Sequence, residues 1–213
     1  MFGRLPEDKR LRVLYAAKRA FAERGFAGAN VNLIAEAAGI SVGSLYKYFR
    51  TKEDIFLAII EMSHEYLEAT IGGIMERERG FRERVRAILE AAVASSLEDP
   101  DIVRIYIACT TEELRPLAAG LSRSIESVAA TRYREMVAEA KLSGEVEPGR
   151  DEAASAFFLD DLFLMVQFAF GSEYYKQRLR LFLGEGADAD PAKVVDAACE
   201  FIGRALPPPR SRG

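Results

Sequence analysis

The spacing of apolar residues constrains the fold of this chain more than any other feature of its sequence. Apolar side chains recur at intervals of three and four, whereas Val, Ile and Thr never form the alternating runs typical of strands. Alanine, the strongest helix former, is abundant. Hydrophobic residues make up 49% of the 213 residues and charged residues 29%, which is the balance of a globular protein. We therefore predict an all-α protein, formed as one large or two smaller domains.

Turn and capping residues divide this helical chain into about nine segments. The first helix follows Pro6 and ends at Gly25, a residue suited to a left-handed cap. Asn30 can cap a short second helix that ends at Gly39, and a third helix begins near Val42. These three helices make up the first quarter of the chain.

A pair that resembles a capping box, Thr51 and Asp54, predicts the start of a long fourth helix, which Gly72 and Gly73 weaken at its far end. Further stops come from Asp-Pro pairs, a turn cluster at residues 144–149, and the prolines after residue 206. The later helices are expected at about 81–98, 100–109, 115–142, 151–183 with a break near Gly171, and 191–206.

The charge of the chain is distributed unevenly. Residues 1–55 carry ten Lys or Arg and six Asp or Glu, a net charge of +4, whereas the remainder carries 19 and 27, a net charge of −8. A basic end on an acidic body suggests an anionic partner at that end, although a solvated helix face would give the same charge pattern.

The sequence provides no sign of a metal site, a cofactor or a membrane anchor. Cys109 and Cys199 are ninety residues apart without CxxC spacing, and His64 is the only histidine. The longest apolar stretch, residues 162–170, is far shorter than the roughly 20 residues that span a bilayer. The first ten residues become charged before any apolar run, unlike a signal peptide. We expect a cytoplasmic protein with no membrane partner.

Residues 30–49 have the pattern of a helix-turn-helix. Ala35 is small enough for two helices to cross closely, Gly39 permits the sharp turn between them, and Ile40 and Leu45 fill the wedge. In such a unit the second helix, here residues 43–49, enters the major groove of DNA.

The second helix carries side chains that can hydrogen-bond to bases or phosphates, namely Ser44, Tyr46, Lys47 and Tyr48. The alternative is that one or both tyrosines pack under the first helix and that Lys47 is merely solvated.

The run GFAGANVNLIAEAAGISVGSLYKYFRTKEDIF resembles the signature of the TetR family of transcription regulators, over about residues 9–60. The family usually has paired threonines where this chain has Ala29 and Asn30, so hydroxyl contacts to the DNA backbone are not expected there, although Asn30 can still cap a helix. The residues that fall at the family's spacing are Gly25, Ile34, Ala35, Ala38, Gly39, Ser41, Gly43, Tyr46, Phe49, Lys52 and Glu53.

The resemblance implies a homodimer that binds a palindromic operator and is released by a small molecule. It implies a helix-turn-helix DNA-binding domain of three helices at residues 1–52, an α-helical effector-binding and dimerisation domain at 53–206, and a disordered tail at 207–213. Tyr46 and Lys52 would contact phosphates, and residues 42–47 would approach bases. The DNA-binding residues so predicted are Asn30, Ser41, Val42, Gly43, Ser44, Tyr46, Lys47, Tyr48 and Lys52.

The body of the chain offers weaker signals, which ordinary packing would also explain. Polar side chains in apolar surroundings are candidates for the ligand pocket: Tyr106, Cys109, Thr110, Asp161, Gln167 and Tyr174. The last helix and the one before it have excess apolar surface, which predicts a four-helix dimer interface unless the chain is a monomer with a large core. The predicted interface residues are Phe163, Val166, Phe170, Val194, Val195, Ala198, Phe201 and Ile202.

Other functions have less support. An enzyme is not indicated, because there is one histidine, no GxSxG and no glycine-rich loop that opens a helix after a strand. Asp160 and Asp161 could do acid-base work only if both faced one cavity, but adjacent residues on a helix point about a hundred degrees apart. The alternative is that both simply face solvent. A helical architectural or interaction protein with a purely structural helix-turn-helix is the remaining alternative to a ligand-responsive repressor.

Overall fold

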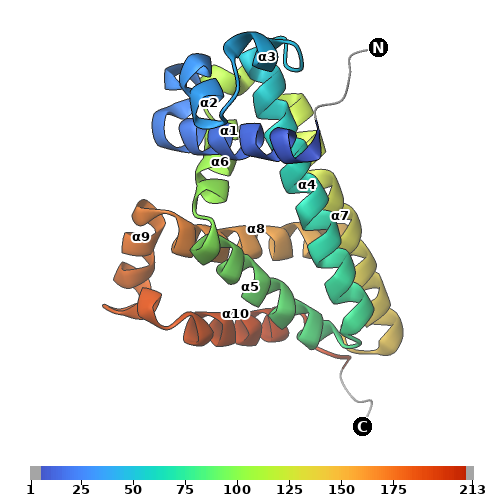
Figure 1. The fold of residues 1–213 in the computed structure, drawn as a ribbon. Coiled ribbons are helices and arrows are strands. Elements are labelled where there is room, and N and C mark those ends of the chain that lie inside the picture. The colour runs from blue at the N-terminus through green and yellow to red at the C-terminus, as the bar shows by residue number, and fades with distance from the viewer. Residues whose placement is uncertain (1–5, 210–213) are drawn as a thin grey trace. The chain divides into compact units, whose positions relative to one another are not determined.

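The structure of the protein is a computed structural model that describes residues 6–209, and over this range it has helices and no strands (Figure 1). Within the range the side chains of residues 113, 118, 119, 121, 122, 124 and 125 are not described. The all-α prediction is confirmed. In chain order the elements are α1 (Glu7–Gly28), α2 (Val31–Ala37), α3 (Val42–Tyr46), α4 (Lys52–Arg77), α5 (Phe81–Glu98), α6 (Asp101–Cys109), the 3₁₀ helix η1 (Glu112–Leu117), α7 (Ala118–Ser143), α8 (Glu152–Gly171), α9 (Glu173–Leu183), the 3₁₀ helix η2 (Ala187–Ala189) and α10 (Pro191–Ala205).

Two predictions made at glycines have different outcomes, the first wrong and the second confirmed. α4 continues through Gly72 and Gly73 to Arg77, since neither glycine adopts a positive φ and the helix is packed on both sides of the pair. The expected break near Gly171 is complete, because Ser172 has extended backbone with φ −127° and ψ 131°. The segment 151–183 is therefore two helices, α8 and α9.

The described residues form two compact units, each with its own core. Unit 1 contains residues up to 65 together with 104–125, and unit 2 contains residues 66–103 and those from 126 onward. This division differs from the predicted boundary at residue 52, because the start of α4 and the segment 104–125 join the N-terminal helices. The assignment of functions to the two parts stays a prediction.

Unit 1 is organised around apolar side chains of α1, α2, α3 and α4. Phe21, Phe56, Leu14 and Leu45 are almost fully buried. Phe21 and Phe56 meet edge to face with ring centroids 5.3 Å apart, and Phe26 contacts both rings. This aromatic cluster fixes the end of α1 against the start of α4, with offset and edge geometries that favour rigid packing.

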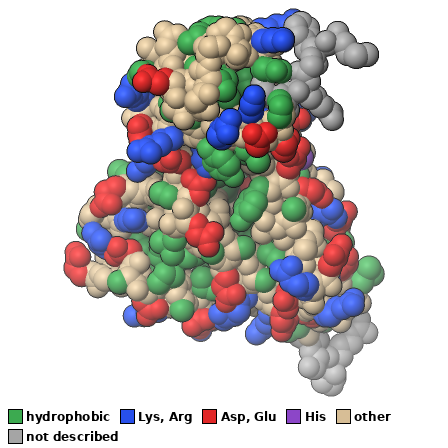
Figure 2. Space-filling model, viewed as in Figure 1, with side chains coloured by type: hydrophobic (Ala, Val, Ile, Leu, Met, Phe, Trp, Pro, Cys, Tyr) green, Lys and Arg blue, Asp and Glu red, His purple; other side chains and the backbone are tan. Residues whose placement is uncertain are grey.

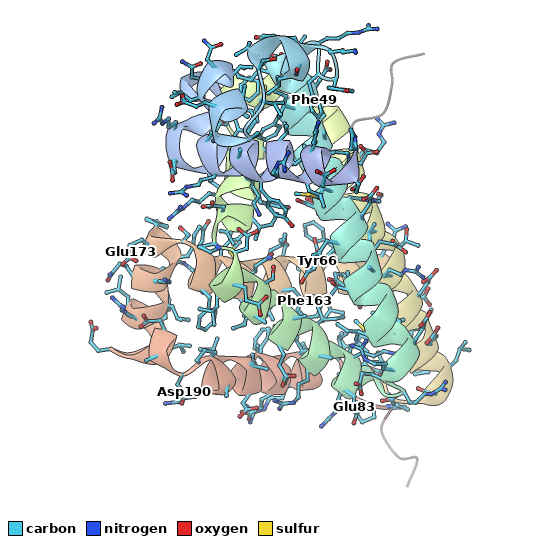
Figure 3. All side chains as sticks on the ribbon, viewed as in Figure 1. Phe49, Tyr66, Glu83, Phe163, Glu173 and Asp190 are labelled. Carbon is cyan, nitrogen blue, oxygen red and sulfur yellow. The ribbon has the colours of Figure 1, made fainter. Side chains whose placement is uncertain are left out.

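Unit 2 is organised around α5, which packs against both α8 and α10. α8 is long and apolar enough to span a membrane by length and composition alone, and 39% of its apolar window is buried within the protein. Phe163 of α8 lies in this core (Figure 3), 5.2 Å from the Tyr133 ring of α7. At the end of the unit, Pro207 accepts a hydrogen bond from the Glu147 N–H at 2.8 Å. The rest of the predicted tail, from residue 210, lies outside the described residues.

Candidate nucleic-acid interface

The helix-turn-helix of unit 1 is held by local side chain to backbone bonds. Asn30 caps α2 through its Oδ1, which accepts from the Asn32 N–H at 2.9 Å, as predicted. Ser41 caps α3 in the same way, accepting from the Ser44 N–H at 3.1 Å. Between the two helices Gly39 has φ 68°, a conformation that a side chain would strain. These bonds fix the angle at which α3 leaves the turn.

α3 has one face turned into the core of unit 1 and one turned to solvent. Leu45 is fully buried and Ala35 of α2 is equally inaccessible, so the two helices cross closely as predicted. Ser44 and Lys47 are exposed, and Tyr46 retains 47% of its accessible surface. Tyr48 is half-buried, so the alternative of packing against the unit applies more to Tyr48 than to Tyr46. The exposed face therefore carries a hydroxyl, a phenol and an ammonium group.

The N-terminus of α4 is closed by its own side chains. Asp54 accepts from the Arg50 and Thr51 N–H groups at 2.9 and 3.2 Å, and Thr51 accepts from the Asp54 N–H at 3.1 Å. This reciprocal pattern is the predicted capping box. The donors that it uses are no longer free to bind an anion.

Lys52, predicted to contact phosphate, directs its ammonium group toward the end of α1. Its Nζ donates to the carbonyls of Ala27 at 3.1 Å and Ala29 at 3.4 Å, and lies 4.7 Å from the centre of the Phe26 ring. A phosphate contact would require the group to leave these partners.

The predicted ligand-pocket residues are divided between the two units. Tyr106, Cys109 and Thr110 belong to unit 1, where Cys109 packs against the core and Thr110 is exposed. The other three belong to unit 2, but Asp161 is exposed, Gln167 is half-buried and Tyr174 keeps 75% of its surface accessible. The ligand pocket stays a prediction.

A half-buried acid in unit 2 was missed by the sequence reasoning. Burial raises the pKa of Asp160 to about 7, and the nearby carboxylates of Glu126 and Asp161 add to the increase. Tyr133, almost fully buried, also has its pKa raised, first by burial and then by Asp160 and Glu126. The position of Asp160 within the most apolar helix of the chain could have indicated that this acid is partly buried. Because Asp161 is its neighbour in sequence, the sequence also fitted two acids that face solvent.

Most of the predicted dimer-interface residues are buried in the core of their own subunit. Because α8 and α10 pack on α5, Phe163, Val166, Phe170, Val194, Val195 and Ile202 are all buried in unit 2, and Ala198 is half-buried. Phe201 alone of the set is exposed, at 63%. A groove of about 290 Å³ runs between α8 and α10, and its apolar lining includes Phe158, Leu162 and Phe201. These three side chains are among those available to a partner, and the dimer itself stays a prediction.

Within residues 6–209, no three His, Cys, Asp or Glu side chains that the structure describes are grouped to hold a metal ion. Cys109 and Cys199 are both half-buried, and the Cys109 Sγ donates to the Ile105 carbonyl at 3.3 Å.

Comparison with known proteins gives a family for this fold. Residues 13–59 match the model of the bacterial regulatory proteins of the tetR family. The chain is 34% identical over 90 residues to the HTH-type transcriptional activator FasR of Mycolicibacterium smegmatis, covering 42% of this chain and 41% of that protein. It is 34% identical over 128 residues to the HTH-type transcriptional repressor KstR2 of Rhodococcus jostii, covering 60% and 61%. These alignments thus span less than two thirds of either relative.

The fold similarity extends over nearly the whole chain. The fatty acid degradation regulator FadR from Bacillus halodurans superposes with a TM-score of 0.74 at 19% identity, covering 94% of this chain and 96% of that one. FadR from Bacillus subtilis, solved in complex with stearoyl-CoA, gives 0.69 at 16% identity, covering 89% and 97%. The predicted resemblance to the TetR family is confirmed, and it is carried by residues 13–59, which match the family model.

Proposed function

We propose that this protein is a sequence-specific DNA-binding transcription regulator that presents α3 to the major groove of an operator. The observation that carries the proposal is the division of α3 into a buried anchor, Leu45, and an exposed polar face with Ser44, Tyr46 and Lys47. A helix held by a buried side chain and a side-chain cap, here Ser41, keeps its polar face fixed, and base readout needs such a fixed face. The proposed contact set is Asn30, Ser41, Val42, Gly43, Ser44, Tyr46, Lys47, Tyr48 and Lys52.

The protein would act as a homodimer on a palindromic operator in the cytoplasm. The groove between α8 and α10, with Phe158, Leu162 and Phe201 in its lining, is the surface that supports self-association. Exposed aromatic side chains are removed from unfavourable contact with water when a second copy covers them. Two α3 helices held in one dimer would then engage two half-sites about one turn of DNA apart.

The regulation would be repression relieved by a small, largely apolar ligand bound by unit 2. The relatives include both an activator and a repressor, and one structural neighbour was solved with stearoyl-CoA. α4 has its first residues in unit 1 and its last in unit 2, which supports coupling along a continuous helix. By linkage, operator DNA must weaken ligand binding by the same factor by which ligand weakens DNA binding.

The test is a titration of the full chain against a labelled operator recovered from genomic fragments, with a scrambled duplex as control. We expect affinity for the operator to fall by about 10³-fold between 50 and 200 mM salt, because neutralised phosphates release counterions. Ser44→Ala should change the ratio of operator to scrambled affinity. Binding that ignores salt and sequence would overturn the proposal and favour a structural helix-turn-helix.

A further inference from the structure

Two polar groups of unit 2, the Tyr133 hydroxyl on α7 and the Asp160 carboxylate on α8, lie beside an apolar core. Tyr133 keeps only 4% of its surface accessible, and its ring meets Phe163, labelled in Figure 3, edge to face at 5.2 Å. Asp160 precedes Phe163 by three residues, so the two side chains are neighbours on one face of α8. Among the residues that the structure describes, neither the hydroxyl nor the carboxylate has a hydrogen-bond partner.

The Tyr133 hydroxyl borders a space large enough for a water-sized group. Every fully buried side-chain nitrogen or oxygen of the described residues has a hydrogen-bond partner. The hydroxyl has none, so it must belong to the small part of this side chain that stays accessible. Because a polar group in an apolar core is unfavourable without a partner, a molecule that enters this space and bonds to the hydroxyl gains a contact that the empty protein lacks.

The charged groups that act on Asp160 are acids. Burial raises its pKa first, the carboxylates of Glu126 and Asp161 raise it further, and no basic side chain of the described residues lowers it. Asp160 and Glu126 also raise the pKa of Tyr133, so both carboxylates lie near the hydroxyl. Glu126 is seven residues before Tyr133, two turns away on the same face of α7. A positively charged group is therefore favoured over water in the space that the hydroxyl borders.

We infer that unit 2 binds an organic cation, whose ammonium group lies between the Asp160 carboxylate and the Tyr133 hydroxyl and whose apolar body packs on the core beside Phe163. An ammonium group has three donors and no acceptor, which suits two oxygen atoms that can both accept. Its bond to a carboxylate is charge-assisted and hence among the stronger hydrogen bonds. A metal ion fits less well, since no three acids among the described residues are grouped to hold one.

The inference deepens the proposed function, on which its regulatory consequence rests, by giving the largely apolar ligand one cationic group. Three probes with the same alkyl chain and different head groups test this charge: n-octylammonium, 1-octanol and octanoate. Each is titrated into the full chain by calorimetry at pH 8, where Asp160 is charged. Octylammonium should bind at least about tenfold more tightly than octanol, and octanoate should bind most weakly because the acids repel it.

Substitutions then locate the binding. Asp160→Asn should remove the preference for octylammonium over octanol, and it should fold, because it removes a charge that burial disfavours. Tyr133→Phe keeps the ring against Phe163 and should lower octylammonium affinity about fivefold. Asp161→Asn is the matched control, since it removes the same charge from an exposed neighbour on α8 and should change the affinity less than about twofold.

Several results would overturn the inference. Equal affinity for octylammonium and octanol would do so, as would tightest binding of octanoate or no saturable binding of octylammonium. A preference for octylammonium that survives Asp160→Asn would equally remove Asp160 from the site.

The operator titration, repeated with saturating octylammonium, tests the proposed function separately. If the probe binds at Asp160 but leaves operator affinity unchanged, the cation site stands and the proposed control by a ligand is wrong. If the original protein fails to bind DNA at all, the proposed DNA-binding function is wrong, and the probe titrations still decide whether unit 2 binds a cation.

Discussion

Units 1 and 2 are both built from helices but differ in how those helices are fixed and in what they expose. The helices of the DNA-binding motif in unit 1 are short, and each begins at a side chain that caps it, as Asn30 and Ser41 do. The helices of unit 2 are long, and α8 and α10 expose Phe157, Phe158 and Phe201. On the face in Figure 2, hydrophobic side chains of unit 2 reach the surface between acidic and basic ones. A polar face fixed by caps suits a charged partner, whereas exposed aromatics suit an apolar one.

The largest expected effect tests whether the two cores are independent. Phe56→Ala removes a fully buried ring from the aromatic cluster of unit 1, and Phe163→Ala removes a buried ring from unit 2. Each should cost about 3–5 kcal/mol, since the missing ring leaves a cavity. Hydrogen exchange should then quicken chiefly in the unit that carries the substitution. Equal loss of protection throughout the chain in both variants would mean that the units unfold as one.

Unit 1 was largely predictable because its signals are local. A cap such as Asn30 or Thr51 acts within three residues, and Gly39 permits its turn through its own backbone, so sequence spacing carries the information. The partners of Lys52 could not be predicted, because they are backbone carbonyls more than twenty residues away, and a carbonyl is present at every residue whatever its side chain.

Unit 2 was predictable in its helices but not in their faces. α8 is apolar on nearly all sides, so its sequence does not say whether Phe163 or Phe158 faces the core. The packing of α5 between α8 and α10 decides this, and it buries Phe163 and Val195 while leaving Phe158 and Phe201 outside. Such packing depends on residues far apart in sequence, which periodicity alone does not relate.

The second effect concerns those outer side chains. Phe158→Glu combined with Phe201→Glu should raise the dimer dissociation constant at least about 100-fold, near 2.7 kcal/mol, because unpaired charges would be buried at the interface. Both residues are exposed in the subunit, at 67% and 63%, so the fold should be retained. Analytical ultracentrifugation measures the association, and Leu181→Glu on α9, 84% exposed, is the matched control. An unchanged dimer would move the interface away from the groove between α8 and α10.

The third effect tests close packing inside unit 2. A Cβ on Gly171, the last residue of α8, would lie 2.3 Å from Val103 Cγ2. Gly171→Ala should therefore lower the free energy of unfolding by about 2 kcal/mol through overpacking. At a solvent-exposed helix position, Gly→Ala would instead stabilise the protein by up to about 1 kcal/mol. The sign of the change in unfolding free energy therefore shows whether Gly171 is closely packed. Val103→Ala in the same chain should recover part of the stability, as measured by urea denaturation.

The smallest effect concerns Asp160. Its pKa in the folded protein, about 7, is above the value of 3.8 for an unburied aspartate, because burial and the carboxylates of Glu126 and Asp161 disfavour the charged form. Between these two pH values the folded state binds more protons at this group than the unfolded state. The group therefore lowers stability progressively as pH rises from about 4 to about 7, and the full decrease persists above that range.

Asp160→Asn removes this dependence, so the variant and the original protein should be similarly stable at pH 4, and the variant should be more stable at pH 8. Because Asp160 retains some contact with water, the difference at pH 8 should be about 1 kcal/mol, or some 2–4 °C in melting temperature for a chain of this length. Asp161→Asn, which alters an exposed neighbour on the same helix, controls for the removal of one negative charge and should give a much smaller difference. Subtracting one melting curve series from the other cancels the pH dependence of the groups that do not interact with Asp160. A gap between Asp160→Asn and the original protein that is the same at pH 4 and pH 8 would show that folding leaves the pKa of Asp160 unchanged, and that the apolar surroundings of α8 exert no control over its protonation.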